Sequence, residues 1–228
     1  MGSLRPLSFF RRIGAFCGMN KPDFFFELAA RATGAAFIAG VDEAGRGPLA
    51  GPVTAAAVRL HPDRIPPGLK DSKQMTATRR RDLCALILDM ADVGIGHASV
   101  EEIDRINILR ASHLAMCRAV AALPAMPDHV LIDGNMIPQG LSCRAEAIIG
   151  GDARCLSIAA ASIVAKVTRD RIMVDLAQQH PGYGWDRNAG YPTRDHVAAL
   201  KELGVTPAHR RSFKPVHNIL YQDVSVTS

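Results

Sequence analysis

The stretch AAFIAGVDEAGRGPLAG, residues 35–51, decides the fold class. Its first seven residues, 35–41, form a short apolar run that is typical of a buried central strand. Two acidic residues, Asp42 and Glu43, follow directly, and a loop containing Gly45 and Gly47 comes next. The pattern predicts a strand that brings two carboxylates and a tight loop to one end of a sheet.

Outward from this stretch, strand-like and helix-like segments alternate. Capping residues open several helices, as in the capping-box pair Ser99 and Glu102, and proline or glycine ends them. We expect further strands at residues 52–60, 91–98, 129–132 and 144–149. We expect helices at residues 76–90, from 99 onward, and at 108–123, 157–179 and 193–204. This alternation predicts an α/β domain around a mixed sheet.

Length and composition fit a single domain. The chain has 228 residues, of which 48% are hydrophobic and 21% charged, and these values exclude an intrinsically disordered protein. We assign residues 35–228 to one domain and residues 1–34 to an N-terminal tail outside the fold, for which partial order stays open. The net charge of +5 favours a polyanionic partner, although many proteins with this charge never bind nucleic acid.

The N-terminal residues and the cysteines bear on location. Phe9-Phe10-Arg11-Arg12 resembles the start of an export signal, but Lys21-Pro22-Asp23 interrupts the chain before any sustained apolar run. No span of ~20 apolar residues occurs. The five cysteines form no CxxC pair and show no zinc-site spacing with histidine. We therefore expect reduced thiols, a cytoplasmic location and no membrane association.

Three acidic sites share one feature, which is that each follows an apolar strand-like run. They are Asp42-Glu43, Asp133 and Asp152. Ligand sites of α/β sheets gather at strand ends, and carboxylates that converge there repel one another unless cations neutralise them. Oxygen ligands without cysteine or histidine favour Mg²⁺ or Mn²⁺ over zinc. Two such ions, about 3.5–4 Å apart, support phosphoryl displacement by water, which is nuclease chemistry.

A structural interpretation of these acids stays open. An aspartate at a strand end is usually a turn former or helix cap, and Asp133-Gly134-Asn135 is ordinary turn chemistry. Asp42 and Glu43 would point to opposite faces of a regular strand. Both can serve one site if the strand ends there, or if one contributes its backbone carbonyl. We predict that Asp42 is the central ligand and that Glu43 reaches the site from its edge.

The loop at residues 45–51 fits neither common phosphate-binding motif. It lacks the Gly-Lys-Ser/Thr sequence of a P-loop, and Pro48 and Pro52 would obstruct the helix that a dinucleotide fingerprint requires. A plain strand-to-strand turn is one interpretation. The other is a tight loop whose backbone approaches a ligand closely.

Seven motifs, in order, resemble those of bacterial ribonuclease HII. They span residues 37–216, most of the chain. The motifs are residues 40–51, Asp71-Ser72-Lys73-Gln74, Ile132-Asp133-Gly134-Asn135, Gly151-Asp152-Ala153, residues 157–170, Gly190-Tyr191-Pro192-Thr193 and His209-Arg210-Arg211-Ser212-Phe213.

The resemblance implies a ribonuclease H-like fold with a helical C-terminal part. It also implies a monomeric endonuclease that hydrolyses RNA in RNA–DNA hybrids and incises 5′ of ribonucleotides embedded in duplex DNA. Such activity leaves 5′-phosphate and 3′-hydroxyl ends and serves ribonucleotide excision in DNA replication and repair. The metal ligands carried over, for Mn²⁺ or Mg²⁺, are Asp42, Glu43, Asp133 and Asp152.

The resemblance also assigns substrate contacts. Backbone groups of Gly45, Arg46 and Gly47 would meet the 2′-hydroxyl, which distinguishes RNA from DNA. Tyr191 would stack on the sugar at the junction. Two positions depart from the family, which often has a lysine or similar residue at Gly150 and a lysine at Ala189.

Several basic and aromatic residues are candidates of lesser weight. Lys73, Lys166, Arg210 and Arg211 could contact backbone phosphates, although Lys166 could equally pair with Asp170 on one helix face. We interpret the run at residues 79–81 as a solvated helix face. We expect core, cap or surface roles for His180, His196 and His209. We expect Tyr183 and Trp185 to pack the loop in which they lie.

Two other functions remain as alternatives. Another ribonuclease H-like nuclease, such as a Holliday-junction resolvase, would cut DNA without ribonucleotides, and residues 45–47 with Tyr191 argue against it. A non-catalytic nucleic-acid-binding protein would not need the full set of carboxylates.

Overall fold

The computed structural model describes residues 22–70, 72 and 75–221, which build a mixed five-stranded sheet with the order β3-β2-β1-β4-β5. The central strand β1 pairs antiparallel with β2 and parallel with β4, β2 pairs antiparallel with β3, and β4 pairs parallel with β5. The strands are β1 (Ile38–Ala44), β2 (Val53–Arg59), β3 (Asp92–Ala98), β4 (His129–Asp133) and β5 (Arg144–Ile148). The predicted α/β fold is confirmed.

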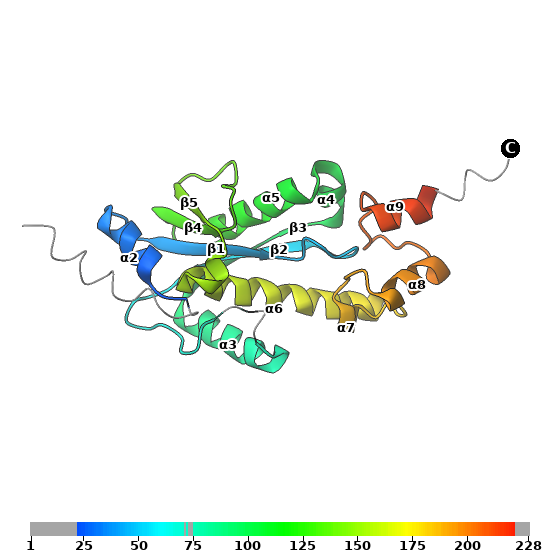
Figure 1. Ribbon diagram of the computed structural model, residues 1–228, viewed down its shortest axis with the longest axis horizontal. Coiled ribbons are helices and arrows are strands. Elements are labelled where there is room, and N and C mark those ends of the chain that lie inside the picture. The colour runs from blue at the N-terminus through cyan, green and yellow to red at the C-terminus, as the bar shows by residue number, and fades with distance from the viewer. Residues whose placement is uncertain (1–21, 71, 73–74, 222–228) are drawn as a thin grey trace, which may run out of the picture.

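Helices cover both faces of this sheet, as Figure 1 shows. Helix α5, which follows α4, packs on one face, and α6 with α3 behind it packs on the other. Helices α7, α8 and α9 lie beyond the end of the sheet and form the expected helical C-terminal part. The helices are α2 (Phe25–Ala32), α3 (Ala77–Met90), α4 (Val100–Ile106), α5 (Ile108–Ala121), α6 (Leu156–Gln179), α7 (Trp185–Asn188), α8 (Arg194–Leu203) and α9 (Lys214–Tyr221), with a 3₁₀ turn η2 (Gly151–Ala153).

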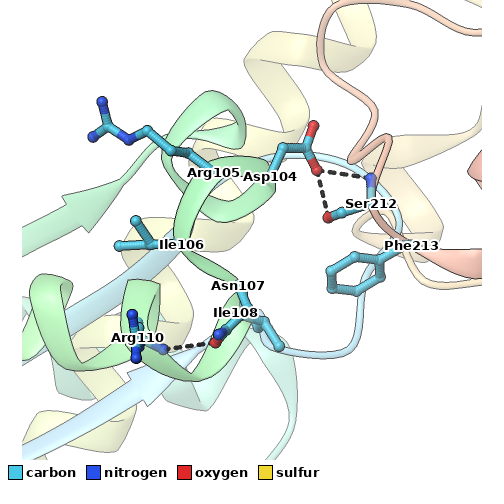
Figure 2. Close-up of a pocket in the computed structure, with 8 residues that line it drawn as sticks. All are labelled: Asp104, Arg105, Ile106, Asn107, Ile108, Arg110, Ser212 and Phe213. Atoms are coloured by element: carbon cyan, nitrogen blue, oxygen red, sulfur yellow. Dashed lines mark hydrogen bonds between the residues drawn. The ribbon is translucent and has the colours of Figure 1, made fainter.

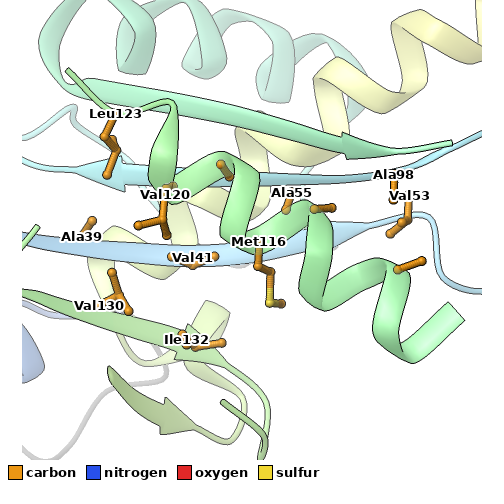
Figure 3. Close-up of a cluster of buried hydrophobic side chains, with 14 of the residues drawn as sticks. Ala39, Val41, Val53, Ala55, Ala98, Met116, Val120, Leu123, Val130 and Ile132 are labelled. Atoms are coloured by element: carbon orange, nitrogen blue, oxygen red, sulfur yellow. The ribbon is translucent and has the colours of Figure 1, made fainter. Parts of the chain in front are cut away.

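The core on the α5 side is built from small and β-branched side chains. Val41 of β1 and Ile132 of β4 meet Met116 and Val120 of α5, and all four are buried (Figure 3). Alternate residues of the same strands face α6, because successive side chains of a strand point to opposite faces. The sheet is therefore buried on both sides, as its apolar runs predict.

Helix α6 lies unusually close to β1 at Gly40. A Cβ atom at this position would lie 2.2 Å from the backbone carbon of Ser157, a distance that no side chain tolerates. The glycine thus lets the buried first half of α6 rest directly on the central strand. This close approach sets the height of α6 over the end of β1, where the carboxylates lie.

Strand β1 is longer than the apolar run suggests. It continues through Asp42 and Glu43 to Ala44, because Asp42 and Glu43 still pair with Ala56 and Ala55 of β2. Of the two ways in which both acids could serve one site, the structure therefore excludes the end of the strand at the acids. The cross-strand partner, which a single sequence segment does not show, sustains the pairing.

Part of the assigned N-terminal tail is packed. Helix α2 buries Glu27 and Ala30, and the Glu27 carboxylate accepts a 2.8 Å hydrogen bond from the backbone N–H of Ser157 at the start of α6. Burial raises the pKa of Glu27. Residues 22–34 thus belong to the packed body, and the boundary at residue 34 is corrected to this extent. Residues 1–21, including Phe9-Phe10-Arg11-Arg12, lie outside the described residues.

In the described part of the chain, Cys84, Cys117, Cys143 and Cys155 are free thiols. No helix there has the length and apolar character needed to cross a membrane.

Candidate active site

Two carboxylates lie side by side at the ends of the two central parallel strands. Val41 of β1 is in register with Ile132 of β4, so Asp42 and Asp133 are the next neighbours along the two strands. Both belong to the face that α6 covers, since Val41 and Ile132 face α5. A hydrogen bond from Ser162 of α6 to Asp42 agrees with this direction.

The turn before α6 carries Asp152 and is hydrogen-bonded to Asp133. The backbone N–H of Gly151 donates a 2.7 Å hydrogen bond to Oδ1 of Asp133, and Asp152 follows within η2. Asp152 is buried. Gly150 enters this turn with φ +64°, a left-handed conformation that glycine adopts without strain. The structure therefore brings Asp42 and Asp133 together and places the turn that carries Asp152 against Asp133.

Glu43 lies at the edge of the cluster. Its backbone N–H donates to Oδ1 of Asp42 at 2.7 Å, and its side chain pairs with Arg46 at 3.2 Å. The charge of Asp133 acts on both Asp42 and Glu43. Glu43 is thus close enough for the charge of Asp133 to raise its pKa, while its side chain is paired with Arg46 of the glycine loop.

The electrostatics of the cluster favour neutralisation. Burial raises the pKa of Asp42 well above its usual value, and the charges of Glu43 and Asp133 raise it further. Burial also raises the pKa of Glu43, while Arg46 opposes the shift. A cation among these oxygen atoms would relieve the repulsion, and an all-oxygen donor set suits Mg²⁺ or Mn²⁺.

Within residues 22–70, 72 and 75–221, no three Asp, Glu, His or Cys side chains form a group that could hold a metal ion as it stands. The fit of a divalent cation therefore rests on the donor chemistry and the mutual repulsion of the carboxylates.

The glycine loop at residues 45–52 is held from beneath by two buried arginines. Arg210 donates to the backbone carbonyls of Gly45 (2.6 Å), Arg46 (3.0 Å), Gly51 (2.9 Å) and Pro52 (3.2 Å). Arg169 of α6 donates to the carbonyls of Ala50, Pro52 and Ala189. The inner carbonyls of the loop are satisfied by guanidinium groups, and this fixes the backbone conformation of the loop.

Tyr191 stands beside this loop. A Cβ atom on Gly47 would lie 3.4 Å from the Tyr191 ring, and the backbone N–H of Leu49 donates to the carbonyl of Gly190 at 2.7 Å. The Tyr191 side chain is partly exposed. The structure thus unites two motifs that are more than 140 residues apart in the sequence.

A family model described as Ribonuclease HII matches residues 39–216. The chain belongs to this family. It is 70% identical over 206 residues to a ribonuclease HII of Cereibacter sphaeroides, with 90% of this chain and 97% of the relative covered. A ribonuclease HII of Paracoccus denitrificans is 66% identical, with 92% of this chain and all of the relative covered.

A solved structure agrees with the family. Ribonuclease H2 of Pyrococcus horikoshii matches with a TM-score of 0.72 and 29% identity, covering 83% of this chain and 100% of that chain. The predicted ribonuclease H-like fold and the predicted enzyme class, an endonucleolytic hydrolase, are confirmed. The family depends on divalent metal ions.

Membership in the ribonuclease HII family also bears on the alternatives. A resolvase that cuts ribonucleotide-free DNA and a binding protein without activity are both set aside. The glycine loop is not a plain turn, because two motifs from the far end of the chain converge on it.

The four residues predicted to contact phosphates differ in burial and in their partners. Arg210 is fully buried and its guanidinium is occupied by carbonyls, so its assignment to a phosphate is wrong. Lys166 pairs with Asp170 at 2.7 Å, the alternative that the sequence left open. Arg211 is exposed. Lys73 lies outside the described residues. The run at residues 79–81 is only partly a solvated face, because Arg80 donates to the carbonyl of Ser72 at 2.6 Å.

Sequence reasoning missed two supports of the site. The first is Arg169, which is buried and which no sequence motif marked as a support. It lies seven residues after Ser162 and therefore on the same face of α6. That spacing is the signal that could have found it. Ser72 is the second support, since its hydroxyl lies 2.8 Å from that of Ser162, the residue that hydrogen-bonds Asp42.

The two departures from the family lie at left-handed positions. A side chain at Gly150 would meet no atom within 4 Å, so a cation there would extend into open space. Ala189 has φ +48°, and its carbonyl is bound by Arg169.

A separate surface pocket of about 420 Å³ lies at the junction of α4 and α5 (Figure 2). None of the four carboxylates lines it. At its rim, the Asp104 carboxylate accepts hydrogen bonds from the backbone N–H groups of Arg211 and Ser212, and from the Ser212 hydroxyl. Asp104 thus fastens the segment that carries Arg210 to the body of the domain.

Proposed function

We propose that this chain incises duplex DNA on the 5′ side of an embedded ribonucleotide and hydrolyses the RNA strand of RNA–DNA hybrids. Its products would be 5′-phosphate and 3′-hydroxyl ends. The observation that supports this proposal is the adjacency of Asp42 and Asp133, with the turn that carries Asp152 hydrogen-bonded to Asp133, beside a glycine loop that Tyr191 borders.

The four acids are proposed as the metal-binding carboxylates, with Asp42 at the centre and Glu43 at the edge. Bound divalent cations, two in number, would activate the attacking water and stabilise the leaving oxygen. Mn²⁺ and Mg²⁺ are the ions we propose, since the donors are hard oxygen atoms. Ser162 orients Asp42, and the Gly151 backbone N–H orients Asp133, so both carboxylates are held before the substrate arrives.

Recognition of the ribonucleotide is assigned to the loop and the tyrosine. Because Arg210 and Arg169 hold loop carbonyls on the inside, backbone groups of Gly45, Arg46 and Gly47 are available on the outer side for the 2′-hydroxyl. Tyr191 would stack on the adjoining sugar. Lys166 remains a proposed phosphate contact, and on binding it would have to exchange its partner Asp170 for a phosphate oxygen. Lys73 is the second proposed phosphate contact.

We further infer that the protein acts as a monomer in the cytoplasm, and that the catalytic domain, assigned from residue 35, extends to include α2. Free thiols at the four described cysteines are compatible with a reducing compartment. Sedimentation of the protein at micromolar concentration tests the monomer, since a dimer would sediment at twice the mass.

The central experiment uses a DNA duplex that carries one ribonucleotide. The parent protein should cut 5′ of that ribonucleotide with Mg²⁺ or Mn²⁺ and not with EDTA. Asp133→Asn should abolish turnover while leaving the fold intact. Asp175→Asn, which alters an exposed aspartate of α6, is the matched control and should retain parental activity. An active Asp133→Asn enzyme would contradict the proposed carboxylate set.

A further inference from the structure

Behind Tyr191 lies a buried box of four rings, which we define as Tyr183, Trp185, His196 and His209. The Tyr183 and Trp185 rings stack with centroids 5.0 Å apart, and the His209 ring packs edge-on against both. All four side chains are less than 5% exposed. Buried imidazoles need satisfied hydrogen bonds, so their partners show what the box does.

The hydrogen bonds of the box fix one protonation pattern. The backbone N–H of Thr206 donates to Nδ1 of His209 at 3.0 Å, so a neutral His209 carries its proton on Nε2. That nitrogen lies 3.2 Å from Nε2 of His196, which also accepts from the indole N–H of Trp185 at 2.9 Å. The proton of a neutral His196 must therefore be on Nδ1.

The Nδ1 atom of His196 lies 2.9 Å from the backbone carbonyl of Tyr191. With the proton on Nδ1, His196 donates to this carbonyl. The chain of donors thus runs from Thr206 through His209 and His196 to the residue that borders the glycine loop. Burial lowers the pKa of both histidines, that of His209 to about 4, so both stay neutral at physiological pH.

We infer that His196 is a positioning residue for substrate discrimination. Through its Nδ1–H it sets the backbone of Tyr191, and His209 and Trp185 hold the imidazole in the one tautomer that can donate. This inference rests on the proposed sugar contact of Tyr191. It goes beyond a packing role, because packing alone would not require a donor at Nδ1.

Two amide variants separate positioning from packing. In His196→Asn the side-chain amide nitrogen can replace Nδ1 and keep the donor to Tyr191. In His196→Gln the amide reaches instead toward Trp185 and His209 and leaves the Tyr191 carbonyl without this donor. Both variants lose the ring, so both should lower Tm by similar amounts.

The readout is the ratio of kcat/KM on a duplex with one ribonucleotide to kcat/KM on a long RNA–DNA hybrid. A loss of stability would change both values together and leave the ratio unchanged. We expect His196→Asn to keep the ratio within about twofold and His196→Gln to lower it about fivefold, the effect of one lost hydrogen bond. Tyr191→Ala gives the benchmark for a lost sugar contact and should lower the ratio at least as much.

The outcomes are distinguishable. If Tyr191→Ala lowers the ratio and His196→Gln does not, the inference about His196 is overturned and the proposed function stands. If Tyr191→Ala leaves the ratio unchanged, both the sugar contact and the inference are wrong, while metal-dependent cleavage by the parent still tests the carboxylates. Should either variant fail to fold, ¹⁵N NMR of the parent decides, because an Nε2–H tautomer of His196 would overturn the inference.

Discussion

Asp42 and Asp133 are neighbours on parallel strands, one residue beyond the paired residues Val41 and Ile132. Their carboxylates repel each other, and burial of Asp42 adds to the cost of ionisation. The folded chain holds this arrangement because the surrounding sheet and α6 position both residues. Such a site is expected to be a source of instability until a cation enters.

Asp42→Asn should therefore stabilise the metal-free protein while it abolishes catalysis. The raised pKa of Asp42 means that its ionised form disfavours folding near neutral pH. We expect an increase in unfolding free energy of about 1 kcal/mol, with kcat reduced at least about 1,000-fold. Thermal unfolding in EDTA and the single-ribonucleotide assay measure the two effects. A variant with lower Tm than the parent would contradict this account.

Divalent metal should raise the Tm of the parent. A ligand that binds only the folded state at 100 times its Kd stabilises by about 2.7 kcal/mol. We expect MnCl₂ to raise Tm by several degrees in the parent and in Asp175→Asn, and by much less in Asp133→Asn. Scanning calorimetry with and without EDTA makes the measurement. Equal shifts in all three proteins would place the binding elsewhere.

The two glycines of the loop should differ in their response to alanine. Gly45 has φ +96°, and a Cβ atom there would lie 1.9 Å from Nε of Arg169. Gly45→Ala should cost more than about 2 kcal/mol. A Cβ atom on Gly47 meets only the Tyr191 ring, at 3.4 Å, so Gly47→Ala should cost less than about 1 kcal/mol but raise KM. Urea unfolding and steady-state kinetics distinguish the two effects.

Replacement of Arg210 should be far more harmful than replacement of its neighbour. Arg210→Met leaves the carbonyls of Gly45 and Arg46 without their donors, at a cost of about 2–4 kcal/mol. Arg211→Met removes an exposed charge and should change stability by less than about 0.5 kcal/mol. Parental stability in Arg210→Met would show that the loop does not depend on this residue.

Glu102 should contribute to stability in a pH-dependent way. Hydrogen bonds from Arg118 and from the Ser99 backbone lower the pKa of Glu102 to about 2, so its contribution is present above its ordinary pKa. It is lost as pH falls from about 4.5 toward 2. Glu102→Gln should cost about 1 kcal/mol at pH 7 and progressively less below pH 4.5. Thermal unfolding of the parent and of Glu102→Gln across this pH range measures the effect, and a difference in stability that does not change with pH would contradict it.

Much of the fold could be predicted from local patterns. The apolar runs at residues 52–60 and 129–132 and the long helix at 157–179 lie within one or two residues of β2, β4 and α6. The two strands are continuous apolar runs, and α6 is ended by Pro181 and Gly182, so local sequence specifies these elements. The placement of Asp42 and Asp133 was predictable for the same reason, because each comes at the end of such an apolar run.

What escaped prediction depends on partners distant in sequence. The length of β1 depends on β2, and the packing of α2 depends on Ser157. The role of Arg210 depends on carbonyls more than 150 residues away, and its sequence context predicted a phosphate contact instead. An arginine beneath a loop leaves no periodic signal in its own segment.

The hydrogen bond from Arg210 to the carbonyl of Gly45 also has a consequence during protein synthesis. Arg210 is synthesised 165 positions after Gly45 and after all four acidic residues of the proposed site. A chain terminated before Arg210 would contain all four proposed acidic ligands and still lack the support for the glycine loop. On the proposed role of this loop, such a product is expected to have impaired ribonucleotide selection.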